Sequence, residues 1–142
     1  MYIFNTPENK KAVFKLCCDV CNVPVTEVMS KTRKRKYMTP KQIACKIYKD
    51  NMLLSLKEIG FIVSYKPQHH ASVINSIRVT NNMLDTNDEE FCTYYNQIMK
   101  GLLDVIKLPN KMIITYQEGF PVDKIVNFLK TKKNVHYEFE AS

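Results

Sequence analysis

Apolar residues recur at helical spacing through most of the first 86 residues. Thr6-Pro7 is typical of a capped helix start, and the apolar positions within 13–21 predict a helix that ends at 22–24. A short turn over 25–29 is expected to follow. Thr39-Pro40-Lys41-Gln42 has the pattern of a capping box with proline at the first helical position, so we expect another helix to begin there.

A second capping box, Ser55-Leu56-Lys57-Glu58, predicts a short helix, because Gly60 follows two residues later. A longer helix is predicted over about 69–84, with Val73 and Ile74 among its buried residues. A short helix, a turn and a second apolar-faced helix make a helix-turn-helix pattern. Alone this signal is weak, since any helical bundle contains such pairs.

The pattern changes in the last third of the chain. Asn87 can cap a helix whose apolar stripe runs through 91–105. Beyond it, the sequence predicts a strand over 111–117, a helix over 121–133 and a half-buried strand around 135–140.

The expected fold is therefore mostly α, a helical bundle with a helix-turn-helix plus a small C-terminal strand–helix–strand unit. We expect a helix-turn-helix domain over 1–86 and a helix plus small α/β tail over 87–142. The exposed sheet edges of such a tail invite pairing with another chain. The tail is thus a candidate for dimerisation, which we favour slightly, or for binding another protein.

Charge adds the first functional information. The 142 residues include 21 Lys and Arg against 14 Asp and Glu, a formal net charge of +7. The basic excess is confined to the first 83 residues, whereas the rest of the chain is mildly acidic. A localised positive field is typical of proteins that bind a polyanion such as DNA or RNA, or an anionic membrane surface.

The densest basic run lies within residues 31–41, around the start of the helix predicted at Pro40. It comprises Lys31, Arg33, Lys34, Arg35, Lys36 and Lys41. Each cation can neutralise a phosphate, and exposed N–H groups at a helix start add a further phosphate site. A solvated surface loop is the alternative interpretation, and phosphate contacts do not by themselves select a sequence.

Polar side chains cluster where the 69–84 helix begins. They include Gln68, His69, His70, Ser72 and Asn75. The N-terminal residues of a recognition helix reach base edges, where Gln and Asn can pair with adenine and Ser with several bases. The alternative is that these are only capping residues.

Four colinear motifs within about 13–83 resemble one family. Ser30-Lys31-Thr32-Arg33-Lys34-Arg35 is similar to its basic loop, and Pro40-Lys41-Gln42-Ile43-Ala44 to a Pro-Arg-Gln-Ile-Ala helix. Ser55-Leu56-Lys57-Glu58-Ile59-Gly60 is similar to its Ser-Leu-x-x-Ile-Gly helix, and His70-Ala71-Ser72-Val73 to its His-Thr-Thr-Val. The family is the C-terminal DNA-binding domain, domain IV, of the bacterial replication initiator DnaA, a helix-turn-helix of the Trp-repressor-like type.

The resemblance implies binding of double-stranded DNA, with the recognition helix in the major groove and the basic loop in the neighbouring minor groove. It implies that Arg33, Arg35 and Lys41 hold the loop side, that Lys57 faces phosphate, and that His70 and Ser72 meet bases. The whole expected interface comprises Lys31, Arg33, Lys34, Arg35, Lys36, Lys41, Lys57, Lys66, Gln68, His69, His70, Ser72 and Asn75.

Several positions depart from the family pattern. Gln68 stands where the family has Arg, His69 where it has Asp, and Ala71 where it has Thr. Thr39 precedes the proline, where the family often has Arg, and the turn is slightly longer. We expect changed base contacts and retained backbone contacts.

The sequence argues against catalysis and cofactors. It contains no Gly-x-x-x-x-Gly-Lys-Ser/Thr motif, so the nucleotide-binding module of the initiator is absent from these residues. Cys17-Cys18-x-x-Cys21 lacks a second ligand pair at zinc-finger spacing, so we expect no metal. Five cysteines without a recognisable signal peptide favour reduced thiols in the cytoplasm, near the nucleoid.

We therefore expect a non-catalytic, sequence-specific binder of duplex DNA that regulates replication or transcription, of a kind suited to a phage or mobile element. Two alternatives stay open. An RNA-binding module could use the same basic loop, although stacking aromatics are scarce near it. A protein-interaction adaptor could reuse the helix-turn-helix, in which case charge reversal at Arg33 and Arg35 would leave affinity unchanged.

Overall fold

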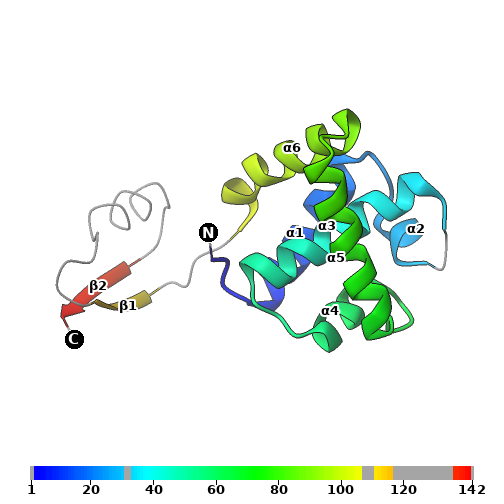
Figure 1. Cartoon of the computed structure of the whole chain (residues 1–142). Helices are drawn as coiled ribbons and strands as arrows, with labels where there is room; N and C mark the ends of the chain where they lie inside the picture. The colour runs from blue at the N-terminus through cyan, green and yellow to red at the C-terminus, as the bar shows by residue number, and fades with distance from the viewer. Residues whose placement is uncertain (1, 31–32, 107–110, 117–135, 142) are drawn as a thin grey trace. The chain divides into compact units, whose positions relative to one another are not determined.

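The computed structural model describes residues 2–30, 33–106, 111–116 and 136–141 (Figure 1). The described helices are α1 (Pro7–Val20), α2 (Val25–Met29), α3 (Arg35–Asn51), α4 (Leu56–Ile62), α5 (His70–Asp85) and α6 (Glu89–Val105). The described strands are β1 (Lys111–Tyr116) and β2 (His136–Ala141). The chain divides into two compact units, Met1–Ile106 and Lys107–Ser142. The mostly helical fold is thus confirmed.

The helical unit is built around α3, which packs against α1 on one side and α5 on the other (Figure 1). Ile43, Ile47 and Tyr48 of α3 are fully buried. The Tyr48 hydroxyl donates to the Lys10 carbonyl at 2.5 Å, which ties α3 to α1. Helix α6 covers α1. The apolar faces expected from the sequence therefore meet in one core.

Helix α1 begins as the sequence predicts. The Thr6 side chain accepts a hydrogen bond from the Asn9 backbone N–H at 3.2 Å, with Pro7 at the first helical position. Val13 and Cys17 are fully buried. The short turn expected over 25–29 is wrong, because Val25–Met29 forms α2, whose Val28 is buried in the core.

The start of α3 also corrects the sequence analysis. Thr39 does not cap the helix, which begins four residues earlier at Arg35 with Lys34 as N-cap. The Thr39 hydroxyl instead donates to the Arg35 carbonyl inside the helix at 3.1 Å. Tyr37 packs against the core, and this contact favours the additional first turn. Pro40 is consequently an internal proline that cannot donate to the carbonyl one turn earlier.

The second capping box is confirmed. Ser55 accepts from the Glu58 backbone N–H at 3.2 Å and begins α4. Helix α4 is short, as expected, but Gly60 does not end it. The turn before α5 passes so close to the backbone of Gly60 that a side chain at this position would not fit. A Cβ on Gly60 would lie 2.6 Å from the Gln68 carbonyl oxygen.

Helix α5 confirms the expected long helix after the turn. Val73 is fully buried, as predicted, but Ile74 is 52% exposed, which corrects its assignment to the core. The buried face continues instead through Ser76 and Thr80. The Thr80 hydroxyl is satisfied by donating to the Ser76 carbonyl at 2.9 Å, so this polar burial is tolerated.

Helix α6 belongs to the helical unit. Its N-cap is Asp88, whose carboxylate accepts from the Phe91 backbone N–H at 3.0 Å. Asn87, expected to be the cap, lies one residue earlier with φ 55°. Because α6 packs against α1, the division falls after Ile106 instead of after residue 86. Our expected domain boundary is corrected accordingly.

In the second unit, β1 and β2 pair in parallel, with Lys111 opposite His136. The helix expected over 121–133 lies outside the described residues, so the complete strand–helix–strand unit stays a prediction, as does its part in dimerisation. None of the described helices is long and apolar enough to cross a membrane.

Candidate nucleic-acid interface

A groove of about 720 Å³ lies where the early part of α3, the turn before α5 and the first turns of α5 meet. Its lining is Ser30, Arg33, Met38, Lys41, Ser64, Lys66, Pro67, Gln68, Ala71, Ser72, Asn75 and Ser76. We call this the basic groove. Two segments that are distant in the chain, within 30–41 and 64–76, thus form one surface of cations and small polar groups.

The basic groove collects about half of the residues predicted from the sequence. These are Arg33, Lys41, Lys66, Gln68, Ser72 and Asn75. Arg33 and Lys66 are exposed, so their charges are free to meet an anion in solvent. Neutral hydroxyls and amides lie between the cations. This composition suits a phosphate backbone with base edges beside it.

Lys41 differs from the other cations because its side chain is buried. Only 3% of the residue is exposed, although it lines the groove. Desolvation by burial lowers the pKa of its ammonium, and nearby Cys45 opposes this shift. A cation that has already lost water gains more from a bound anion than an exposed one does.

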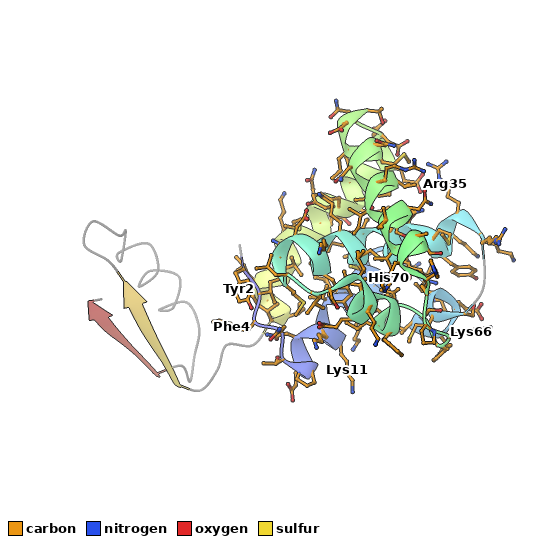
Figure 2. All side chains as sticks on the ribbon, turned by 60° about the horizontal axis from the view of Figure 1, so that its bottom comes forward. Tyr2, Phe4, Lys11, Arg35, Lys66 and His70 are labelled. Atoms are coloured by element: carbon orange, nitrogen blue, oxygen red, sulfur yellow. The ribbon has the colours of Figure 1, made fainter. Side chains whose placement is uncertain are left out.

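Arg35 and Lys36 lie apart from the basic groove. Arg35 is 3.8 Å from the Asp88 carboxylate of α6, and Lys36 lies 4.8 Å from the centre of the Tyr37 ring. Both line a separate hollow with acidic residues at the start of α6. Figure 2 shows Arg35 and Lys66 well apart. The basic run predicted as one surface is therefore divided between two.

Two further cations expected at the interface are not among the lining residues of the basic groove, and a third is not described by the structure. Lys34 is the N-cap of α3 and is exposed. Lys57 is exposed in the first turn of α4 and does not line the basic groove. Lys31 lies outside the described residues.

The two histidines begin α5 and do not line the basic groove. His69 is the N-cap, and its Nδ1 accepts from the Ala71 backbone N–H at 3.2 Å. This is the capping role that the sequence analysis kept as its alternative. His70, labelled in Figure 2, is exposed as the first residue of the helix. The centre of its ring lies 6.0 Å from the centre of the His69 ring.

The backbone of Gln68 fixes the turn against α4. Its N–H donates to the Gly60 carbonyl at 3.2 Å, directly beside the close approach described above. Its side-chain Oε1 is buried without a hydrogen-bond partner among the described residues. An unsatisfied buried acceptor costs about 1–3 kcal/mol. The main role of Gln68 in this structure is to hold the turn against α4. Its side-chain oxygen is available to accept a hydrogen bond from a donor.

Arg78 is a candidate that the sequence analysis missed. Its Nη2 donates to the Asn75 Oδ1 at 2.7 Å, and both side chains are exposed on α5. Residues three apart in a helix share a face, and this spacing with a positive charge was the available signal. Because the Asn75 oxygen already accepts from Arg78, the side-chain N–H donors of Asn75 are the groups that this contact leaves available.

The cysteines show no sign of a reactive or metal-binding site within the described part of the chain. Burial raises the pKa of Cys18 and Cys45 to about 12 each. The described residues hold no group of three potential metal ligands. That the protein lacks a cofactor stays a prediction.

Comparisons with known proteins agree on one part of the chain. Residues 11–79 match the family described as bacterial dnaA protein helix-turn-helix. A relative is the chromosomal replication initiator protein DnaA of Wolbachia sp. subsp. Brugia malayi, which is 34% identical over 86 residues. That alignment covers 61% of this chain but only 18% of the relative. No solved structure matches the chain.

Proposed function

We propose that this protein is a non-catalytic, sequence-specific binder of double-stranded DNA, because residues 11–79 match the bacterial dnaA protein helix-turn-helix family. The observation that carries the proposal is the basic groove, where Arg33, Lys41 and Lys66 surround the polar start of α5. In a helix-turn-helix, the start of the second helix lies in the major groove. The three cations then flank it at phosphate positions.

Lys41 is proposed as the anchor for one phosphate. Its ammonium is partly desolvated before DNA arrives, so an anion restores the stabilisation lost on burial. Arg33 and Lys66 contact phosphates from exposed positions and contribute mainly through counterion release. Arg35 and Lys36 contribute less, because the acidic start of α6 offsets their charge.

Base selection is assigned to Ser72 and Asn75. Asn75 donates to base acceptors such as guanine O6 or thymine O4, since Arg78 already occupies its oxygen. A bidentate pair with adenine would require that oxygen to turn toward the base. The preferred site is therefore expected to differ from one chosen by a free asparagine.

The proposed biological role is supported by the composition of the basic groove and by the family match. The alignment covers 18% of the length of the DnaA relative, and residues 11–79 match the helix-turn-helix family. We propose that the protein occupies DNA sites that an initiator would also recognise, and so regulates replication or transcription in the cytoplasm.

Fluorescence anisotropy of a labelled duplex, titrated across salt, tests this function. Duplex DNA should bind more tightly than matched single-stranded DNA or RNA. Replacing Arg33 or Lys66 with Ala should each reduce the slope of log affinity against log salt by about 0.9. Lys49→Ala is the matched control, because Lys49 is exposed on α3 and does not line the groove. Equal losses for all three variants, or a preference for single strands, would refute the proposal.

A further inference from the structure

A second groove of about 640 Å³ lies among α1, α2 and the end of α4. Its lining is Pro7, Lys10, Lys11, Ala12, Phe14, Lys15, Asp19, Val25, Met29 and Ile62. We call this the α1 groove. It shares no lining residue with the basic groove, and the proposed function makes no use of it.

The α1 groove combines an apolar floor with one charged wall. Ala12, Val25 and Met29 are all half-buried, so apolar surface stays in contact with solvent there. Lys11 and Lys15 are exposed on α1 and lie one helical turn apart (Figure 2 labels Lys11). Neither forms an ion pair with any carboxylate within the described part of the chain.

From this charge pattern we infer that the α1 groove is a docking site for an acidic amphipathic helix of another protein. A partner helix lying along α1 would place its apolar side on the floor and carboxylates, spaced by one turn, opposite Lys11 and Lys15. Asp19 at the far end of the wall disfavours an acidic residue there. That asymmetry sets the direction of the bound helix.

The partner can bind while the basic groove is occupied. Met29 lines the α1 groove, and its carbonyl accepts from the Tyr65 N–H at 3.1 Å and from the Ser64 hydroxyl at 3.2 Å. Ser30, the next residue, lines the basic groove. The two grooves are thus neighbours across the end of α2. The arrangement would bring an acidic partner to a bound DNA site.

A charge swap on the full chain tests the docking site. The probe is a designed amphipathic helical peptide of roughly 15–20 residues, long enough to form a helix. Leucines form one face, and a row of glutamates flanks it. Its affinity is measured by fluorescence anisotropy for the wild type and for the double variant Lys11→Glu with Lys15→Glu. The comparison peptides are a lysine-for-glutamate version and a scramble.

The wild type should bind the acidic peptide at least about tenfold more tightly than the scramble, and the double variant should lose this difference. The lysine version should bind the double variant and not the wild type. Lys49→Glu, a matched charge change outside both grooves, should change peptide affinity less than twofold. An acidic peptide that binds no better than the scramble overturns the proposal.

Two further measurements distinguish a peptide-docking groove from a membrane-binding or a DNA-binding surface. Phosphatidylglycerol vesicles that bind in a Lys11- and Lys15-dependent way, without peptide binding, would assign the groove to a membrane surface and overturn the proposal. Ala12→Phe fills the groove without changing charge, so it should weaken peptide binding and leave duplex binding intact. A loss of duplex affinity in the double variant, but not in Lys49→Glu, would assign the lysines to DNA instead.

Discussion

Replacing Gly60 by Ala tests whether the turn of the helix-turn-helix depends on a close backbone approach. The new Cβ would lie 2.6 Å from the carbonyl oxygen of Gln68, so α4 and the turn must move apart. The hydrogen bond from the Gln68 N–H to the Gly60 carbonyl, 3.2 Å long, would be strained by the same shift. The turn that positions α5 would then be displaced.

The magnitude follows from three opposing contributions. Overpacking costs about 1–3 kcal/mol, and loss of the hydrogen bond costs about 1 kcal/mol. Removing a glycine from a helix recovers about 1 kcal/mol. Gly60→Ala should therefore lower the free energy of unfolding by about 1–3 kcal/mol, with a fall in Tm of roughly 4 °C for each kcal/mol.

Urea unfolding followed by far-UV circular dichroism measures this change, and Gly101→Ala is the matched control. A Cβ on Gly101 in α6 would lie 3.1 Å from Leu16 Cδ1, the far end of a flexible side chain. That residue can move, so Gly101→Ala should be neutral or slightly stabilising. If Gly60→Ala is as stable as Gly101→Ala, the close approach does not constrain the turn and the reasoning fails.

Three other substitutions or treatments have defined outcomes. Lys41→Met should raise the urea midpoint, because it removes a desolvated cation, yet lower duplex affinity about tenfold by removing a charged phosphate contact. Burial lowers the pKa of Lys41 in the folded state, so the unfolded chain holds more protons at alkaline pH. The free energy of unfolding of the wild type should therefore rise, relative to Lys41→Met, as the pH increases and Lys41 loses its proton. Parallel curves of stability against pH for the two proteins would contradict this. Arg78→Ala should free the Asn75 oxygen and shift the preferred base toward adenine. Selection of binding sites from a random duplex pool measures this preference. An unchanged preferred DNA site would show that the contact between Arg78 and Asn75 does not guide base selection. The buried thiol of Cys45, with a pKa of about 12, should resist alkylation at pH 8 until urea unfolds the chain, and rapid native labelling would contradict its burial.

Local capping signals were reliable only where nothing else competed with them. Ser55 caps α4 as its sequence predicts. Thr39 carries a similar signal, yet it lies inside α3, because Tyr37 packs on the core and extends the helix toward its N-terminus. A cap contributes about 1 kcal/mol, which burial of an aromatic side chain can exceed.

The candidate site was only partly predictable for a related reason. The basic run is continuous in sequence, but the first turn of a helix directs successive side chains to different sides. Arg33 and Lys41 reach the basic groove, whereas Arg35 faces Asp88. Arg78 was missed because its contact with Asn75 is visible only once both lie on one helix face.

The sequence by itself determined the helical character, the start of α1 and α4, the long helix after the turn and the excess of positive charge. These properties depend on neighbours within one or two helical turns, whose distances the chain fixes locally. Only the tertiary structure decided where α3 begins, that α6 joins the helical unit, why Gly60 is a glycine and which cations share a groove. Each of these depends on contacts between segments distant in sequence, which exist only after the helices have packed.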